Sequence, residues 1–419
     1  MKTPFFILIF SFSTFLCGQN YDTNWKGHFS FLNIKKVVEA ENKFYAASEN
    51  ALFSYDTQTN QLNTITTVNG LSGELISTLH YSYEYQLLLI GYENGLIEIY
   101  SETDQEILKV VDIINKVTIP PSQKKINHFN EFNSLIYIAT DYGISVYSLE
   151  GLEFGDTYYI GSNGSQIRVN QTAILNNEIY AACGLNNGIK KASLSNSNLT
   201  DFQLWGTIVS GDFTAVLASA SSIYAVNLSN TIFEINGTAL NTLFNFPQPV
   251  VELNTSETKL LVTTNSKVYQ YGPGFNLIDT YSLPTELDTF FTCALITGAD
   301  VYIGTKNYGI IRPDPLAVYG YEEIHPEGPL RNAAFSLTYG YGNLWVTYGE
   351  YSIFFNPSPS RNYGISNYVD MNWHNTTYDS IQQATNKTVS NLNAISINPL
   401  NPGQVFISSF AHGLLNFQK

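Results

Sequence analysis

The chain has 419 residues, of which 44% are hydrophobic and 14% aromatic, so it can bury a large core without disulfide cross-links. Its 35 acidic and 20 basic residues give a formal net charge of −15. A chain with this excess of negative charge can neutralise few phosphates, which argues against nucleic acid as a partner.

Residues 1–18 have the pattern of a secretory signal peptide. Lys2 supplies the positive start, Phe5–Leu16 form an apolar run, and Gly18 is a small residue suited to cleavage before Gln19. The apolar run is too short to span a membrane. We therefore expect an exported protein, with an uncleaved anchor or a lipidated Cys17 as the alternatives.

One pattern recurs nine times after the leader: a short apolar strand, a tight turn and a second strand. Copies begin about every 37 to 49 residues, except for a last gap of about 61. Further apolar stretches between the copies, such as Leu75–Leu79 and Leu277–Tyr281, bring each period to four strands. The nine apolar strands are Tyr45–Ser48, Leu89–Tyr92, Tyr137–Thr140, Tyr180–Cys183, Tyr224–Asn227, Leu261–Thr264, Tyr302–Thr305, Trp345–Tyr348 and Phe406–Ser409.

This period predicts an all-β fold in which each repeat is one four-stranded antiparallel blade of a β-propeller. Seven blades of about 43 residues close a ring near residues 325–330, so we assign 19–329 to a seven-bladed propeller. Residues 330–419 then hold blades 8 and 9, the first blades of a second, incomplete propeller. Pro313, Pro315, Pro326 and Pro329 mark the expected crossing. Strands exchanged between the two rings are the alternative.

The geometry of the predicted strands and turns explains the small residues and glycines within the repeat. Ala, Gly, Ser and Thr after the apolar pair let strands taper toward the axis, and glycines such as Gly95 and Gly143 suit turns that need a positive φ. The eighth copy takes Ser352 and Ile353 as its second strand. The polar stretch 372–389 accounts for the wide last gap as a helix or an ordered loop, and the chain resembles a fragment of a longer protein.

The sequence carries no catalytic, metal-binding or cofactor motif that we recognise. Cys183 and Cys293 are expected to be buried and unpaired, with a mutual bridge as the alternative. The six histidines are scattered singly; His80 and His128 are expected to be hydrogen-bonded structural imidazoles. Three basic doublets, Lys35-Lys36, Lys124-Lys125 and Lys190-Lys191, are expected to be solvated loop pairs, with contact to an anionic glycolipid as the alternative.

Aromatic residues outside the repeated strands are the candidates for surface contacts. Most of the 29 Tyr and 26 Phe belong to the repeat, where packing between blades explains them. Trp373 and His374 fall in a stretch that we expect to be a loop. The candidate contact residues are Tyr319, Tyr321, Tyr339, Tyr341, Trp373 and His374.

Two known groups share particular residues with this chain. Asn69–Ser72 followed by Leu89–Leu96 resembles the propeller repeat of periplasmic sensor domains in two-component regulators. The wider arrangement, in the same order over the mature chain, resembles the PorZ family of the type IX secretion system of Bacteroidota. The residues that carry this resemblance are Trp25, His28, Ser30, Phe31, Tyr45–Asp56, Leu89–Gly95, Tyr180–Ala182 with Gly188 and Ile189, Asp201–Trp205, Ile397–Pro402 and Val405–Phe410.

The PorZ resemblance implies a non-enzymatic protein at the cell surface or outer membrane. Members of that family carry two seven-bladed propellers and a sorting domain, act with the sortase PorU and with PorV and PorQ, and present anionic lipopolysaccharide. A periplasmic ligand-sensing propeller of a two-component regulator is the alternative function. A propeller hydrolase or lyase is a third, and it predicts three or more carboxylates converging on the axis.

Overall fold

The computed structural model describes residues 26–256, 258–354, 356, 360–410 and 412–418. The predicted signal peptide, with its cleavage site at Gly18 and Gln19, lies outside these residues, as do Cys17 and Trp25. Within the described part of the chain, no helix is long and apolar enough to cross a membrane.

The predicted fold class is confirmed as all-β, with repeated four-stranded antiparallel sheets, each built from four strands in chain order. The first sheet contains β1 (Lys36–Glu39), β2 (Lys43–Ala47), β3 (Leu52–Asp56) and β4 (Leu62–Ile65). The second contains β5 (Ile76–Ser82), β6 (Leu87–Tyr92), β7 (Ile97–Ser101) and β8 (Glu106–Val110). The third contains β9 (Ile126–Phe132), β10 (Leu135–Thr140), β11 (Gly143–Ser148) and β12 (Glu153–Tyr158). The fourth contains β13 (Val169–Leu175), β14 (Glu178–Cys183), β15 (Gly188–Ser193) and β16 (Gly206–Val209).

Three more sheets of the same kind follow up to residue 324. The fifth contains β17 (Phe213–Ser219), β18 (Ser222–Asn227), β19 (Thr231–Asn236) and β20 (Ala239–Asn245). The sixth contains β21 (Val250–Ser256), β22 (Lys259–Thr264), β23 (Lys267–Gly272) and β24 (Asn276–Ser282). The seventh contains β25 (Phe291–Thr297), β26 (Asp300–Thr305), β27 (Ile310–Pro313) and β28 (Tyr321–Ile324). Short helices occupy some connections: η2 (Thr67–Asn69), α1 (Asp112–Asn115), η3 (Pro121–Gln123), η4 (Ser162–Gly164), η5 (Phe202–Leu204) and η6 (Pro273–Phe275).

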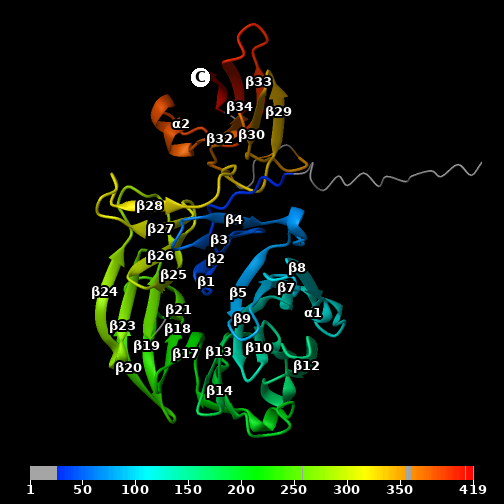
Figure 1. The fold of residues 1–419 in the computed structure, drawn as a ribbon, viewed down its shortest axis with the longest axis vertical. Coiled ribbons are helices and arrows are strands. Elements are labelled where there is room, and N and C mark those ends of the chain that lie inside the picture. Colours follow the sequence, from blue (N-terminus) through cyan, green and yellow to red (C-terminus); the bar gives the residue numbers. More distant parts are fainter. Residues whose placement is uncertain (1–25, 257, 355, 357–359, 411, 419) are drawn as a thin grey trace, which may run out of the picture.

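These sheets are arranged around a common axis (Figure 1). The first strand of each sheet is the innermost one and contacts the first strand of the next sheet, from β1 through β5, β9, β13, β17 and β21 to β25. Strand β25 in turn contacts β1, so the series returns to its beginning. Each sheet up to residue 324 consists of consecutive strands, and among the described residues no strand is exchanged with the later part of the chain.

The segment 26–35, which precedes β1, packs on the seventh sheet where the series closes. The amide of Ile34 donates to the carbonyl oxygen of Thr305 at 2.9 Å, and the amide of Gly309 donates to the carbonyl oxygen of Leu32 at 2.8 Å. Phe31 and Ile34 are buried in one cluster with residues of the first and seventh sheets. Apolar side chains of this segment therefore fill the space between the first and last sheets.

The core consists of apolar clusters that lie between neighbouring sheets. The cluster between the first and second sheets, for example, joins Tyr45 and Leu52 to Leu88 and Ile90. Cys183 and Cys293 are buried in two such clusters and are free, as expected. Burial raises the pKa of both thiols to about 12, so both behave as small apolar side chains.

The turn glycines have the backbone conformation that the sequence predicts. Gly95 has φ +89° and Gly143 has φ +147°, both in the region that L side chains rarely adopt. A Cβ atom at Gly143 would lie 2.4 Å from the carbonyl oxygen of Tyr158. The β10–β11 turn therefore accepts only glycine at this position.

Replacing Gly143 with alanine is expected to lower the free energy of unfolding by about 2 kcal/mol, because the backbone must leave its φ or displace β12. Chemical denaturation of the purified protein measures this loss. Gly206→Ala is the matched control, because a Cβ atom there meets nothing within 4 Å. Equal stability of Gly143→Ala and Gly206→Ala would show that the turn is not constrained.

Two further sheets follow residue 330. One contains β29 (Ser336–Gly340), β30 (Asn343–Thr347), β31 (Ile365–Val369) and β32 (Asn372–Thr376), and the other contains β33 (Leu392–Ile397), β34 (Gln404–Ser409) and β35 (Gly413–Gln418). Helix α2 (Tyr378–Thr385) connects them, so the polar stretch does carry a helix. These sheets lie beyond β4 and β28, on one side of the ring (Figure 1).

The expected second strand of the eighth repeat is wrong. Strand β30 pairs with β31, with Leu344 opposite Tyr368, and not with residues 352–353. Ser352 and Ile353 lie in the long connection between the two strands, and Ile353 is 87% exposed. A short polar-apolar pair soon after the strand imitates a hairpin, whereas the real partner begins only at residue 365.

Candidate functional site at the ring axis

The innermost strands share a β-bulge near their start. In β5, β9, β13, β17, β21 and β25 the pairing with the next strand shifts by one residue immediately after the first apolar residue. A bulge bends the strand and redirects a side chain. The redirected positions are Ser77, Asn127, Asn170, Thr214, Val251 and Thr292.

Three of these redirected side chains connect one sheet to the next. Ser77 Oγ donates to the carbonyl oxygen of Ile126 at 2.6 Å, Asn127 Nδ2 to that of Val169 at 2.9 Å, and Asn170 Nδ2 to that of Phe213 at 2.7 Å. Each acceptor is the residue just before the bulge of the following strand. The bulges therefore join successive innermost strands through side-chain to backbone hydrogen bonds.

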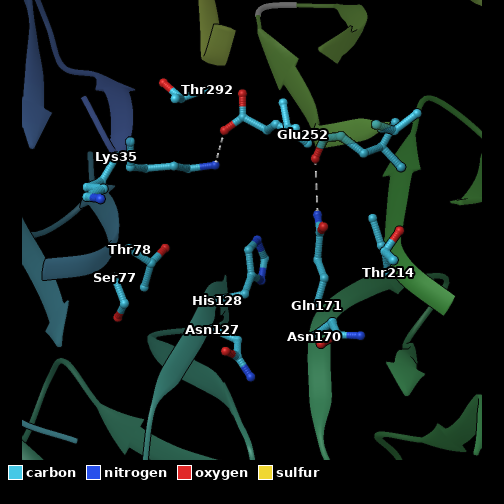
Figure 2. Close-up of a pocket in the computed structure, with 15 residues that line it drawn as sticks. Lys35, Ser77, Thr78, Asn127, His128, Asn170, Gln171, Thr214, Glu252 and Thr292 are labelled. Carbon is cyan, nitrogen blue, oxygen red and sulfur yellow. Dashed lines mark hydrogen bonds and ion pairs between the residues drawn. The ribbon is translucent and has the colours of Figure 1, made fainter. Parts of the chain in front are cut away.

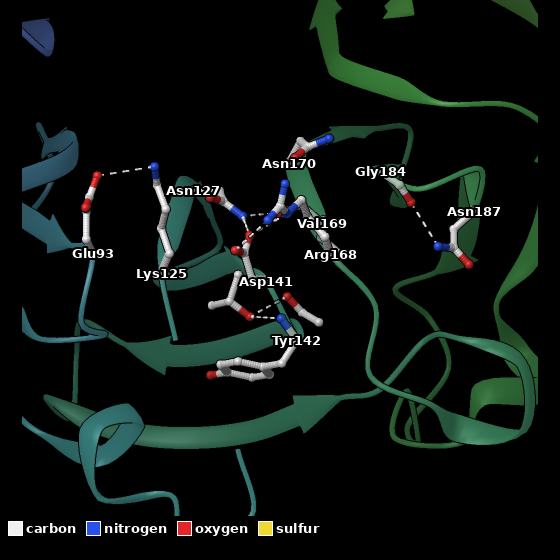
Figure 3. Close-up of polar contacts among 12 residues, drawn as sticks. Glu93, Lys125, Asn127, Asp141, Tyr142, Arg168, Val169, Asn170, Gly184 and Asn187 are labelled. Carbon is white, nitrogen blue, oxygen red and sulfur yellow. Dashed lines mark hydrogen bonds and ion pairs between the residues drawn. The ribbon is translucent and has the colours of Figure 1, made fainter. Parts of the chain in front are cut away.

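Charged pairs surround these bonds at the same end of the ring (Figure 3). Arg168, two residues before Asn170, contacts the carboxylate of Asp141 at 2.9 Å, and Asn127 Nδ2 donates to the same carboxylate at 2.8 Å. Lys125, just before β9, lies 3.5 Å from a carboxylate oxygen of Glu93. Basic residues before one strand thus meet acidic residues from the turn of the preceding sheet.

A cavity of about 200 Å³ lies on the axis and is lined by residues from all seven innermost strands. Figure 2 shows Gln171 and His128 projecting into it, with Glu252 on another wall. Lys36 Nζ lies 2.5 Å from Glu252 Oε1, and the amide of Ala294 donates to Glu252 Oε2 at 2.9 Å. Gln171 Nε2 donates to the carbonyl oxygen of Leu253 at 3.3 Å. The side chains of Lys36 and Gln171 thus both contact β21, and each contact passes over an intervening sheet.

His128 differs from the structural imidazole that the sequence predicts. His80 is such an imidazole, because its Nε2 lies 2.8 Å from Glu131 Oε2. The Nδ1 atom of His128, by contrast, is buried and has no hydrogen-bond partner in the protein. Burial, together with the positive charges of Lys36 and His80, lowers the pKa of His128 to about 3.

This lowered pKa predicts acid sensitivity. The unfolded chain protonates His128 near pH 6.5 and the folded chain only near pH 3, so stability falls as pH decreases through that window. Because the cavity is open to solvent, we expect a loss of about 2 kcal/mol rather than the full linkage value.

Denaturation midpoints between pH 7 and pH 4 should show a flatter profile for His128→Gln. The control His374→Asn, at an exposed position, should keep the wild-type slope. Parallel profiles for wild type and His128→Gln would exclude His128 as the cause.

The lysine doublets are not solvated pairs as expected. Lys36 reaches into the axial cavity, and Lys124 and Lys190 are each 7% exposed. Lys124 Nζ donates to the carbonyl oxygen of Ile114, and Lys190 Nζ donates to Thr207 Oγ1 at 2.9 Å. One lysine of each doublet is therefore a structural residue.

A second cavity, of about 560 Å³, lies between the seventh sheet and the part of the chain after residue 330. Tyr308 lines it from the ring, and Tyr363, Tyr378 and Asp379 line it from the other side. Burial and the charges of nearby carboxylates, Asp379 first among them, raise the pKa of Tyr308. The hydroxyl of Tyr378 is buried without a partner. This junction cavity therefore combines aromatic and acidic groups.

The segment 26–35 also fastens the later sheets to the ring. The amide of Ser30 donates to Asn332 Oδ1 at 2.6 Å, and Ser30 Oγ donates to the carbonyl oxygen of Leu330 at 2.9 Å. Trp373 Nε1 donates to His28 Nδ1 at 3.1 Å, and the His28 ring packs against Tyr368 and Trp373. Burial lowers the pKa of His28, which favours its neutral, accepting form.

The predicted contact residues do not form one site. Tyr319 lies in the β27–β28 connection and is 65% exposed, whereas Tyr321 begins β28 and is half-buried. Tyr339 belongs to β29 and Tyr341 to the β29–β30 turn, where its hydroxyl donates to the carbonyl oxygen of Pro399. Trp373 and His374 lie in β32, so the expected loop is wrong. Trp373 is engaged in packing with His28, while His374 is exposed.

The axis does not have the carboxylates that a propeller hydrolase or lyase would need. Among the residues that line the axial cavity, Glu252 is the one carboxylate, and it is paired with Lys36. The described residues also contain no group of three or more His, Cys, Asp or Glu arranged to hold a metal ion. Polar binding is the chemistry that the axial residues support.

Comparison with known proteins finds a family that part of this chain resembles. Residues 44–206 match the N-terminal β-propeller domain of PorZ from the type IX secretion system. That match confirms the resemblance predicted from the sequence. No curated protein sequence matches the chain.

Solved structures agree with this match at the level of the fold. A structure of PorZ, an essential bacterial surface component of the type IX secretion system of Porphyromonas gingivalis, superimposes with a TM-score of 0.77 at 16% identity. The alignment covers 94% of this chain and 52% of that one, so this chain spans about half the length of the PorZ structure. The computationally designed Ika8 protein aligns with a TM-score of 0.47 at 11% identity, over 67% of this chain and 96% of that one.

Proposed function

We propose that the chain is an exported, non-enzymatic scaffold of the type IX secretion system that acts at the cell surface or outer membrane. The match of residues 44–206 to the PorZ propeller domain is the observation that carries this proposal. Its partners are the sortase PorU with PorV and PorQ, and it presents anionic lipopolysaccharide to that sortase. A rigid ring that displays loops suits a binding role of this kind.

The proposed architecture assigns residues 19–329 to a seven-bladed propeller and residues 330–419 to the opening blades of a second. The later sheets resemble blades in two respects. Strand β33 has the same bulge, at Asn393, and Thr338 Oγ1 of β29 donates to the carbonyl oxygen of Ile395 at 3.0 Å. Leu337 and Tyr339 on β29 are 62% and 74% exposed, which suits a face that another blade covers.

The loop 314–320 is the proposed contact with the sortase complex. Leu316, Val318 and Tyr319 in this loop are 95%, 91% and 65% exposed. Large apolar side chains gathered on one exposed loop are typical of a protein-protein contact. The half-buried Tyr321 supports the loop, because its ring centroid lies 6.3 Å from that of Tyr319.

A pull-down of the tagged chain from outer membranes tests the proposal. We expect the sortase and lipopolysaccharide to accompany the wild-type chain, and a Val318→Ser/Tyr319→Ser variant to recover about tenfold less sortase. Tyr83→Ser, which alters a 55% exposed tyrosine of the β5–β6 turn, is the matched control and should recover wild-type amounts. Absence of the sortase from the wild-type sample would overturn the function. Equal recovery by both variants would overturn only the role of the loop.

A further inference from the structure

The axial cavity carries a positive charge that contrasts with the rest of the chain. Two lysines line it, Lys35 and Lys36, and its one carboxylate is Glu252. The wall therefore has one unbalanced positive charge in a chain whose formal net charge is −15. A positive cavity attracts anions, because a cleft lined by one sign of charge raises the local concentration of the opposite sign.

The hydrogen-bond donors that remain free in the cavity also suit an anion. The Nδ2 atom of Asn170 and the Nε2 atom of Gln171 already donate to backbone carbonyl oxygens. Lys36 shares its ammonium with Glu252 through one contact and retains further N–H donors. The amide of Lys35 donates to the carbonyl oxygen of Ala47, whereas its side chain makes no hydrogen bond or ion pair within the described residues and is exposed at the margin of the cavity.

His128 adds an unsatisfied group to the same wall. Its buried Nδ1 has no protein partner, whereas most buried polar groups in folded proteins bond to the protein or to an ordered water. In the neutral ring one nitrogen donates and the other accepts, so His128 can donate to an anion without being protonated. The hydroxyl of Thr78 lies on the same cavity wall (Figure 2).

We propose that the axial cavity binds a small oxyanion of the carboxylate or phosphate class, held by Lys35, Lys36 and His128. The volume of about 200 Å³ equals roughly six or seven water molecules, which is the size of inorganic phosphate with its closest waters. The bulges in the innermost strands build this site, since they bring polar residues of successive sheets to one level. This site is separate from the loop 314–320 and does not depend on the proposed secretion role.

Calorimetric titration of the purified chain with inorganic phosphate, and separately with acetate, tests the site at constant ionic strength. We expect saturable binding of at least one of the two anions, weakened fivefold or more in Lys35→Gln. Lys35 is exposed, so this variant should fold normally, and an unchanged melting temperature without anion checks that. Lys267→Gln, at an exposed position on β23 outside the cavity, is the matched control and should bind like wild type.

Preference between phosphate and acetate identifies the class of oxyanion. Proton-detected nitrogen spectra of His128 provide a second readout, because the bound anion should shift its ring signals while those of His374 stay constant. Binding of neither anion, or equal binding by wild type and Lys35→Gln, would overturn the proposal and leave a cavity that holds water alone.

Discussion

Ile34→Ala is expected to destabilise the protein by about 3 to 4 kcal/mol, one of the two largest effects of a single substitution that we predict. Ile34 is fully buried between the first and seventh sheets, in one cluster with Val37 and Cys293. Truncating its side chain leaves a cavity at the place where the ring closes. The adjacent backbone bond, from Ile34 to Thr305, depends on the same packing.

Denaturant unfolding followed by tryptophan fluorescence and by circular dichroism measures this effect. We expect a lower midpoint in both signals for Ile34→Ala. Val117→Ala is the matched control, because Val117 is 96% exposed and its truncation should change the midpoint little. If Ile34→Ala were as stable as Val117→Ala, residues 26–35 would not close the ring.

Lys36→Met is expected to cost about 3 kcal/mol, because it leaves the carboxylate of Glu252 without its cation in a nearly buried position. The Glu252 side chain is 8% exposed and that of Lys36 19%. Burial lowers the pKa of Lys36, but the charge and hydrogen bond of Glu252 outweigh it, so the pKa is raised overall. The pair therefore stabilises the ring at neutral pH and loses this contribution as pH rises above about 10.5.

The double variant Lys36→Met/Glu252→Leu distinguishes a lost ion pair from lost packing. Replacing both charges with apolar groups removes the unpaired carboxylate, so the double variant should recover most of the lost stability. Thermal unfolding of wild type, both single variants and the double variant completes the cycle. Losses that simply add would contradict coupling between Lys36 and Glu252.

The sequence predicted the ring because its repeats share an apolar strand and a turn glycine at a regular spacing. The seventh sheet ends at Ile324, and the expected closure near residues 325–330 stays a prediction. The doublet Lys190-Lys191 was misinterpreted because neighbouring residues in a strand face opposite sides. Lys190 and Lys191 both lie in β15, and Lys190 is buried while Lys191 is half-buried. Two adjacent lysines in one strand therefore lie in two different environments.

The axial site could not be predicted from single motifs, because seven strands far apart in sequence each contribute only a few residues. A signal does exist in the aligned repeats. An apolar residue followed by Ser, Asn or Thr begins most innermost strands, as in Ile126-Asn127 and Phe213-Thr214. Such a pair is inconspicuous in any one repeat. Only the bulge redirects its polar side chain. The β32 strand was likewise missed because its polar residues resemble a loop.

Cross-linking between β1 and β25 tests the closed ring most directly. Thr297 Oγ1 donates to Glu39 Oε1 at 2.7 Å, although the two residues lie 258 positions apart. Produced without residues 1–18, the chain keeps only the buried Cys183 and Cys293, so introduced cysteines can be labelled selectively. A short bismaleimide should join Glu39→Cys to Thr297→Cys in the folded protein and fail to join Glu39→Cys to Ser219→Cys on β17. Equal cross-linking of both pairs, or none between positions 39 and 297, would contradict the ring.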